Sequence, residues 1–183
     1  MDLTGKLLAA MPGMGDARFE RALVMVCSHS PEGAMGLIIN RTMPDFSFPN
    51  LLDQLGIQKG GAPAIEVHYG GPVERSRGFV LHRGRYMGGS DVMHIQGGFQ
   101  MSATLNVVED IAAGKGPRQA LLALGYSGWG PSQLEQEVAE NAWLTLDAEP
   151  AVIFDHPNAQ KWGAALRVMG VDPVMLSGAA GHA

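Results

Sequence analysis

The stretch FERALVMVCSHSPEGAMGLIIN, residues 19–40, decides how the rest of the chain is interpreted. Its first part, 19–30, is mostly apolar and rich in residues that favour strands, and a second apolar run follows at 34–40. The residues between them, Ser-Pro-Glu-Gly at 30–33, are typical of a turn. Two apolar runs on either side of a Pro/Gly turn predict an antiparallel hairpin.

Further strands are expected along the chain. Residues 65–73 and 77–83 are predicted to form a second strand pair around a Gly-Gly-Pro turn. The apolar run 120–128 fits a strand or a helix, and the glycines at its far end favour a strand. The runs 143–148 and 151–155 are also predicted to be strands.

Three segments carry helix signals. A helix over 47–56 is expected to end at Gly56, and a helix over 106–114 to be capped by Asn106 and to end at its last glycine. A third helix, 158–170, is predicted to place apolar residues along one side, namely Trp162, Ala165, Leu166 and Met169.

The order of these elements predicts the fold class. Strands come in pairs and helices are inserted irregularly, without the alternation of βαβ units. We therefore expect an α+β (mixed α/β) fold, with a largely antiparallel sheet or a partly closed β-barrel and flanking helices. The 183 residues fit a single domain, 1–183, and the glycine-rich stretch QKGGAPA (58–64) is interpreted as a surface loop.

Composition restricts the function classes. The net charge is −5 and no basic stretch is longer than HRGRY (82–86), which disfavours direct nucleic-acid binding. The one cysteine, Cys27, rules out an intramolecular disulfide. Asp2 and Pro12 make the N-terminal stretch a poor signal peptide, and no apolar run approaches the roughly 18 residues of a membrane span. A cytoplasmic protein without membrane segments is expected.

Ser127 stands in LGYSGWGPSQLEQEVAENAWL (124–144), where it suggests the nucleophile of a hydrolase. That motif, G-x-S-x-G, needs two glycines because the backbone packs tightly around a strained serine. Trp129 occupies the position of the second glycine. The pair Ser132 and Glu135 instead fits a capping box, so Ser127 is interpreted as part of a tight loop before a capped helix.

Other catalytic and metal motifs are weak. Cys27 and His29 lie two residues apart on a predicted strand and would share one face, as a thiolate–histidine pair requires, although Cys27 also fits the end of a buried run. The six histidines show none of the short spacings of metal sites. No metal and no cofactor are predicted.

One candidate site combines polar and aromatic residues near the ends of the predicted strands. Its members are His29, Glu32, Asn40, Arg41, Arg77, His82, Trp129 and Gln133. If these side chains converge at one end of the sheet, the guanidinium groups and a helix N-terminus suit a small anionic ligand or a carboxylate of a partner protein. In the alternative interpretation, Asn40 and Arg41 merely end a strand and Trp129 anchors a loop.

Four blocks of sequence resemble one bacterial family, the YqgE/AlgH family. They are AMPGMGDARFERALVMVCSHSPEGAMGLIINR (10–41), YGGPVERSRGFVLH (69–82), the 124–144 stretch and LSGAAGHA (176–183). The resemblance implies a barrel-like sheet surrounded by helices. It implies little about activity, because the family is largely uncharacterised and provides no catalytic residues to carry over, although one branch is named as a transcriptional regulator of polysaccharide synthesis.

Three functional hypotheses remain. The first is a non-enzymatic protein that binds a partner protein or a small ligand. The second is an enzyme acting on a small anionic substrate through Arg41, Arg77 and a histidine. The third is a transcriptional regulator, acting indirectly because the sequence has no helix-turn-helix or basic recognition helix.

Overall fold

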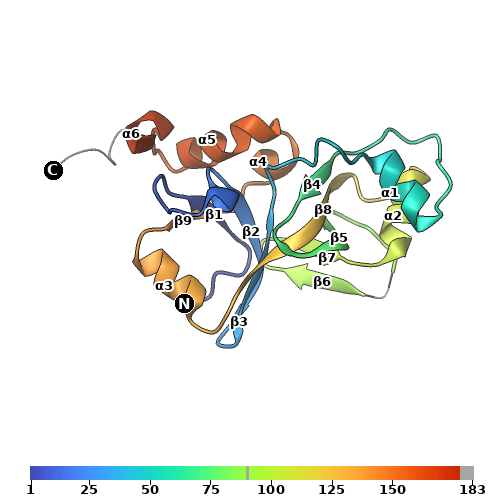
Figure 1. Ribbon diagram of the computed structural model, residues 1–183. Helices are drawn as coiled ribbons and strands as arrows, with labels where there is room; N and C mark the ends of the chain where they lie inside the picture. Colours follow the sequence, from blue (N-terminus) through green and yellow to red (C-terminus); the bar gives the residue numbers. More distant parts are fainter. Residues whose placement is uncertain (90, 178–183) are drawn as a thin grey trace.

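The computed structural model describes residues 1–89 and 91–177 (Figure 1). The strands are β1 (Lys6–Ala10), β2 (Leu23–Ser30), β3 (Gly33–Ile38), β4 (Val67–Tyr69), β5 (Val73–Arg83), β6 (Val92–Ile95), β7 (Phe99–Ser102), β8 (Gln119–Trp129) and β9 (Trp143–Asp147). Within the described residues they form one curled sheet in the order β6-β7-β5-β8-β3-β2-β1-β9, with β4 added against β8. The β4–β8 pair is parallel and the other pairs are antiparallel, which confirms the predicted α+β class.

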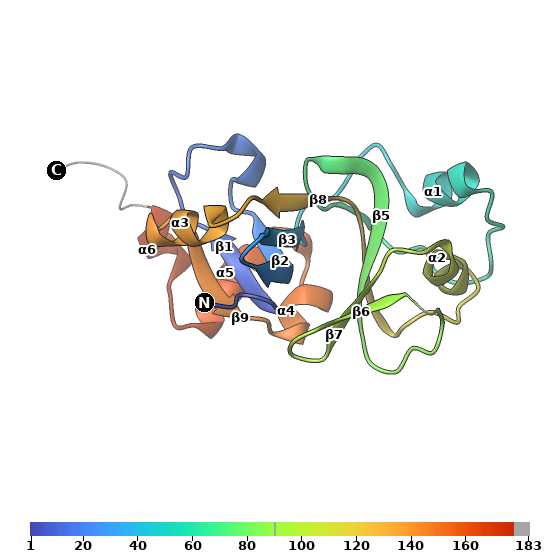
Figure 2. The ribbon, with the colours of Figure 1, turned by 90° about the horizontal axis from the view of Figure 1, so that it is seen from below.

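Helices cover both faces of this sheet. They are the short 3-10 helix η1 (Ala17–Phe19), α1 (Phe48–Leu55), α2 (Leu105–Ala112), α3 (Gln133–Ala139), α4 (Pro150–Phe154), α5 (Asn158–Val168) and α6 (Pro173–Ser177). We call the face that packs against α4 and α5 the inner face, and the opposite face the outer face. On the outer face, α1 and α2 pack against β4, β5 and β8, while α3 packs against β9 and the end of β8 (Figures 1 and 2).

Helices α4 and α5 fill one end of the inner face. Trp162 and Leu166 are buried there, among residues of β1, β2, β3 and β7. The Trp162 indole donates to the carbonyl of Ala10 at 3.0 Å, and the Lys161 ammonium donates to the carbonyl of Ile39 at 2.9 Å. Buried polar groups need such partners, so these two bonds fix the position of α5 on the sheet.

Several sequence predictions are confirmed. β2 and β3 form the hairpin expected from residues 19–40, although the strand begins only at Leu23. Helix α1 begins after a capping box of Ser47 and Asn50 and ends at Gly56, whose φ of +68° suits glycine. The ambiguous run 120–128 is a strand, and 143–148 contains β9.

The predicted pairing of 65–73 with 77–83 is wrong. β4 and β5 both pair with β8, on opposite sides of it, so the chain between them crosses β8. Gly70 and Gly71 make this crossing, and a Cβ on Gly71 would lie 2.2 Å from the carbonyl carbon of Tyr126. The Gly-Gly pair is therefore required for a close backbone crossing, which a local turn interpretation could not reveal.

The strand predicted over 151–155 is also wrong, since residues 151–154 belong to helix α4 and Asp155 caps its C-terminus. Pro150 occupies the first helical turn, where its fixed φ favours a helix, and the carbonyl of Glu149 accepts from the amides of Val152 and Ile153. The β-branched residues of this segment, which suggested a strand, are used to fill the inner face.

Two predicted caps are wrong, and one helix face is only partly as expected. Helix α2 starts after Thr104, so Asn106 lies inside it. Ser132 has a φ of +60° instead of the extended backbone usual for an N-cap, and its side chain makes no capping bond; the Gln133 side chain accepts from the Gly130 amide. On α5 the predicted apolar side is buried except for Met169, which is half exposed.

Candidate functional site

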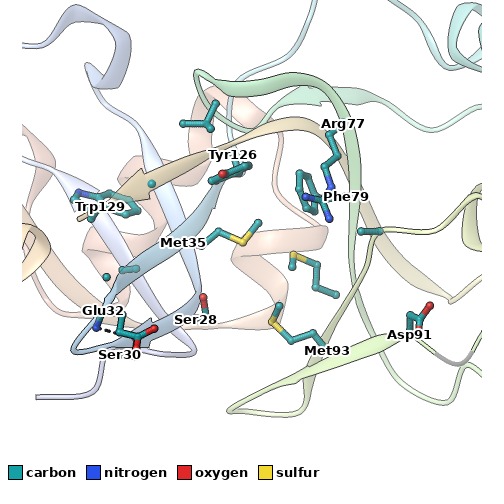
Figure 3. A pocket seen from close by; sticks show the side chains of 16 residues that line it. Ser28, Ser30, Glu32, Met35, Arg77, Phe79, Asp91, Met93, Tyr126 and Trp129 are labelled. Atoms are coloured by element: carbon teal, nitrogen blue, oxygen red, sulfur yellow. Dashed lines mark hydrogen bonds between the residues drawn. The ribbon is translucent and has the colours of Figure 1, made fainter. Parts of the chain in front are cut away.

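The other end of the inner face is an open cleft of about 670 Å³, which Figure 3 shows from close by. One wall is the β2–β3 hairpin, and the opposite wall is formed by β5, β6 and β7. It is lined by Ser28, Ser30, Glu32, Gly33, Ala34, Met35, Val73, Arg77, Phe79, Asp91, Met93, Met101, Ala103, Tyr126, Gly128 and Trp129.

A β-bulge in β2 creates the hairpin wall. Val26 pairs with Gly36 and Ser28 pairs with Met35, so Cys27 is an extra residue in the ladder. Cys27 therefore belongs to the inner core while the following Ser28 also faces inward and lines the cleft. The next residue, His29, is turned to the outer face, where the Leu3 amide donates to its Nδ1 at 3.0 Å.

The alternative of a Cys27–His29 pair is wrong, because the bulge places the two side chains on opposite faces, and the interpretation of Cys27 as the end of a buried run is confirmed. Cys27 is buried, and this burial raises the pKa of its thiol to about 12. Its Sγ donates weakly to the Met25 carbonyl at 3.6 Å. A thiol with such a pKa is not a thiolate nucleophile near neutral pH.

The floor of the cleft is apolar and continuous with the inner core. Met101 and Phe79 belong to that core, and Met35 and Tyr126 pack against it. The rings of Phe79 and Tyr126 meet edge to face with centroids 5.8 Å apart. Met93 lies directly opposite Met101 across β6 and β7, and Figure 3 shows Met35 and Met93 extending into the cleft from opposite walls. Flexible thioethers beside aromatic rings form an adaptable surface for apolar groups.

The rim of the cleft carries more negative than positive charge. Glu32 lies on the hairpin wall and Asp91 precedes β6 on the other wall. The Arg77 guanidinium lies over the Phe79 ring, 5.1 Å from its centroid, and 3.4 Å from the carboxylate of Glu74. One guanidinium already beside a carboxylate faces two further carboxylates, so the rim favours a positively charged group more than an anion.

Three of the eight predicted site residues, Glu32, Arg77 and Trp129, line this cleft. Trp129 belongs chiefly to the outer core, where its indole donates to Glu137 at 2.9 Å. Gln133 donates to the same Glu137 side chain and accepts from the Gly130 amide, so it fixes the start of α3.

His29 is not at the cleft. Its Nδ1 accepts from the backbone, so its Nε2 carries the proton and donates to Glu135 at 3.0 Å. That hydrogen bond contributes to a lowered pKa of the Glu135 carboxyl, whose largest cause is a hydrogen bond from its own backbone amide. His29 thereby ties β2 to α3.

The remaining predicted residues make structural contacts as well. Asn40 accepts from the Leu23 amide and donates to the Arg21 carbonyl, and Arg41 donates to the carbonyls of Arg18 and Glu20. Both therefore secure the loop before β2, in line with the interpretation that they end a strand. The structure thus brings together only part of the predicted site.

His82 is fully buried between β5 and β7, where its Nε2 lies 2.9 Å from the Ser102 hydroxyl. Desolvation lowers the pKa of His82, so its ring is neutral at pH 7. Ser102 is buried too, which leaves this Ser–His pair without access to a substrate in the described structure.

Sequence reasoning missed the residues that form most of the cleft. Met35, Phe79, Met101 and Tyr126 fit the alternation of buried strand residues. They differ from the rest of the core only because none of the described helices covers this end of the sheet. Within residues 1–89 and 91–177, no group of three or more His, Cys, Asp and Glu side chains is arranged to hold a metal ion. No helix in the same ranges is both long and apolar enough to cross a membrane.

Comparison with known proteins places the chain in a family. The family described as AlgH-like, DUF179, matches residues 7–174. A UPF0301 protein of Jannaschia sp. is 54% identical over all of this chain and 96% of its own, and one of Ruegeria pomeroyi is 53% identical over the full length of both.

Solved structures agree with the sequence relatives. The solution structure of the AlgH protein from Pseudomonas aeruginosa is 39% identical, with a TM-score of 0.76 over 98% of this chain and 95% of that one. A crystal structure of a Corynebacterium diphtheriae protein, 21% identical over 94% of this chain and 88% of its own, shares the fold with a TM-score of 0.72. The family model matches residues 7–174, and relatives that the chain covers over nearly their full length are 53% or 54% identical to it. This chain therefore belongs to the AlgH-like UPF0301 family.

Proposed function

We propose that this protein is a non-enzymatic binding protein whose cleft receives an apolar group of a ligand or of a partner protein. The observation that carries the proposal is the floor formed by Met35, Phe79, Met101 and Tyr126, which continues the inner core but is open to solvent. An apolar concavity with a few polar groups at its rim is the usual form of a binding site.

The chemistry of the lining supports binding rather than catalysis. Among the described residues that line the cleft there is no histidine, cysteine or lysine. General acid–base catalysis works best with a group whose pKa lies near the operating pH, and carboxylates, serines and a tyrosine do not supply one without a large shift. The titratable groups at the rim are better suited to orienting a bound molecule.

The predicted anionic ligand stays a prediction, and the balance of charge at the rim argues for a different polar group. Glu32 and Asp91 would attract a cation, while Arg77 already has Glu74 beside it. We therefore expect ligands with an apolar body and an amine or guanidinium end. A regulatory role of the kind that the family resemblance implies would act through such a bound partner.

A cleft-filling substitution tests the proposal. A Cβ on Gly128 would make only ordinary contacts, the nearest at 3.5 Å from the Tyr126 ring, so Gly128→Leu should place a side chain in the cleft without straining the strand. Gly61→Leu is the matched control, because Gly61 lies outside the cleft with nothing within 4 Å of its Cβ position.

The probe is 1-aminoanthracene, a fluorescent aromatic amine that is uncharged at neutral pH and so tests the apolar floor, combined with a thermal-shift screen of amphipathic metabolites that includes alkyl amines and guanidines. The wild type and Gly61→Leu should bind it saturably at one site, and Gly128→Leu should not. A screened ligand at 100 times its dissociation constant should add roughly 2.7 kcal/mol of stability. The absence of saturable binding, or equal binding by Gly128→Leu, would contradict the proposal.

A further inference from the structure

We infer that the natural occupant of the cleft is an extended segment of a partner protein, which adds as a strand to the free edge of β6 and carries a basic side chain next to apolar ones. This inference rests on the proposed function, because it assigns an occupant to the same cleft.

The first observation is that β6 is an edge strand. β7 is the one strand that pairs with it in the described part of the chain, through four consecutive residue pairs from Val92↔Ser102 to Ile95↔Phe99. The other edge of β6 leaves a row of backbone amide and carbonyl groups open to a further strand. Met93 and His94 on this strand are exposed.

The second observation is that this edge lacks most of the usual protections. Proteins blunt free edges with very short strands, lysine, proline, a bulge or a covering element, and of these β6 has its short length but no lysine, proline or bulge. The four residues of β6 are Val, Met, His and Ile, and its register with β7 has no bulge. The opposite edge of the sheet, β9, is packed by α3 and carries a Lys6–Asp147 ion pair. A regular edge without lysine, proline or a bulge is suited to strand addition.

The third observation is that the edge and the cleft adjoin. β6 forms one rim and the hairpin tip with Glu32 forms the other, as Figure 3 shows. Met93 points into the cleft from β6. In an added strand, the residue opposite Met93 would point to the same face, and the residues two positions away would do so too. Alternate side chains of the partner would therefore enter the cleft.

Charge identifies the chemistry of that segment. The side chains that enter the cleft meet thioethers and rings at the floor and the carboxylates of Glu32 and Asp91 at the rim. Apolar residues at alternate positions, with arginine or lysine at the ends of the apolar run, complement both. Arg77, already beside Glu74, offers less attraction to an acidic segment.

The probe peptide is acetyl-Arg-Thr-Val-Thr-Leu-Thr-Val-Thr-Arg-amide, which places Arg, Val, Leu, Val and Arg on one face. Two derivatives carry N-methyl groups on alternate residues, one on the odd positions and one on the even positions. In a strand, the amides of alternate residues point to opposite sides, so only one of the two sets donates to β6. We expect one derivative to lose at least tenfold in affinity by fluorescence polarisation and the other to bind like the parent.

Two variants on adjacent residues of β6 provide the matched control. Met93→Lys introduces a positive charge facing the cleft and should weaken the peptide at least tenfold. His94 is on the opposite face of the same strand, where its Nδ1 lies 3.3 Å from Gln100, so His94→Lys should bind within twofold of the wild type. Circular dichroism is the check that both variants are folded, and hydrogen exchange should show new protection at those alternate amides of residues 92–95 that face away from β7.

The outcomes separate this inference from the proposed function. If both N-methylated peptides bind like the parent, the cleft is occupied without strand addition and the inference is overturned, while the proposed function stands. If 1-aminoanthracene binds but the peptide does not, the occupant is a small molecule and the inference is again overturned. If neither binds, both proposals fail.

Discussion

The two ends of the inner face share β2, β3 and β7 but are covered differently. At one end α4 and α5 cover the sheet, and Trp162 and Leu166 are buried against it. The side chains of Lys161 and Trp162 also donate hydrogen bonds to backbone carbonyls of Ile39 and Ala10. At the other end Met35 and Met93 face a cleft that none of the described helices lines. The strands continue to place apolar side chains on the inner face beyond the point where the helices end. The apolar side chains that no described helix covers form the candidate site.

Two local irregularities of the backbone orient the side chains that line the open end. The bulge at Cys27 turns Ser28 inward, and Gly125, with a φ of +74°, changes the face to which the later residues of β8 point. Leu121 and Ala123 before this glycine are on the inner face, and so is Tyr126 after it. Without the shift, the Tyr126 ring would point away from the cleft.

The largest effect is expected at the filled end. Leu166→Ala should lower the free energy of unfolding by about 2–5 kcal/mol, because a fully buried side chain leaves a cavity between α5 and the sheet. Urea denaturation followed by circular dichroism measures it. A loss below 1 kcal/mol would show that α5 does not close this end as tightly as its burial implies.

The pH dependence of stability tests the burial of Lys161 at the same end. Burial lowers the pKa of Lys161 to about 8, from an unfolded value near 10.5. Between these values the unfolded chain binds more protons than the folded one, so this group makes stability rise with pH, by roughly 3 kcal/mol in total. Below about pH 8 both states are protonated and the slope disappears.

The measurement is the difference in unfolding free energy between wild type and Lys161→Met from pH 7 to pH 11. Taking the difference removes the contributions of Cys27 and Tyr86, whose pKa values are raised by burial and which both proteins share. A difference curve that is flat across this range would mean that Lys161 is as well solvated in the folded protein as in the unfolded chain.

An intermediate effect is expected behind the open end. The Glu137 carboxylate accepts from the indoles of Trp129 and Trp143 at 2.9 and 2.8 Å, and so holds the end of β8 against α3. Glu137→Leu leaves both buried N–H groups unpaired and should cost about 2 kcal/mol. Glu137→Gln, which keeps an acceptor oxygen, should cost less, and equal losses in the two variants would argue against this role.

The smallest effect is expected inside the cleft. Met93 is 38% exposed, so Met93→Ala should change the unfolding free energy by less than about 1 kcal/mol. Paired with Leu166→Ala in the same denaturation series, it measures the contrast between the two ends. A loss comparable to that of Leu166→Ala would show that the open end contributes to stability as a core does.

Local signals made part of the fold predictable. The hairpin of β2 and β3, the capped helix α1 and the strand β8 each depend on residues close in sequence, such as Ser47 and Gly56 around α1. The crossing of β8 by Gly70 and Gly71 and the helical state of Pro150–Phe154 depend on contacts with distant segments. Tertiary packing overrides local preference in such cases.

The candidate site was less predictable than the fold. Polar residues near strand ends indicated a site, but the side chains of Asn40 and Arg41 form hydrogen bonds to nearby backbone groups and are not free to bind a ligand. His29 was assigned to the wrong face because a bulge of one residue reverses the alternation after it. No pattern in a single sequence marks such an extra residue, so the apolar lining became visible only in the structure.

β8 has a consequence for the order in which the protein folds. Among the described strands, β1, β2 and β3 pair with one another, as do β5, β7 and β6, and β8 alone joins the two groups. Both groups are complete before residue 119 is synthesised, so each can form early from neighbouring segments, while pairing with β8 closes long loops. The order of synthesis thus allows two partial sheets to form before β8, and the cleft between them is complete only after β8 has paired with both groups.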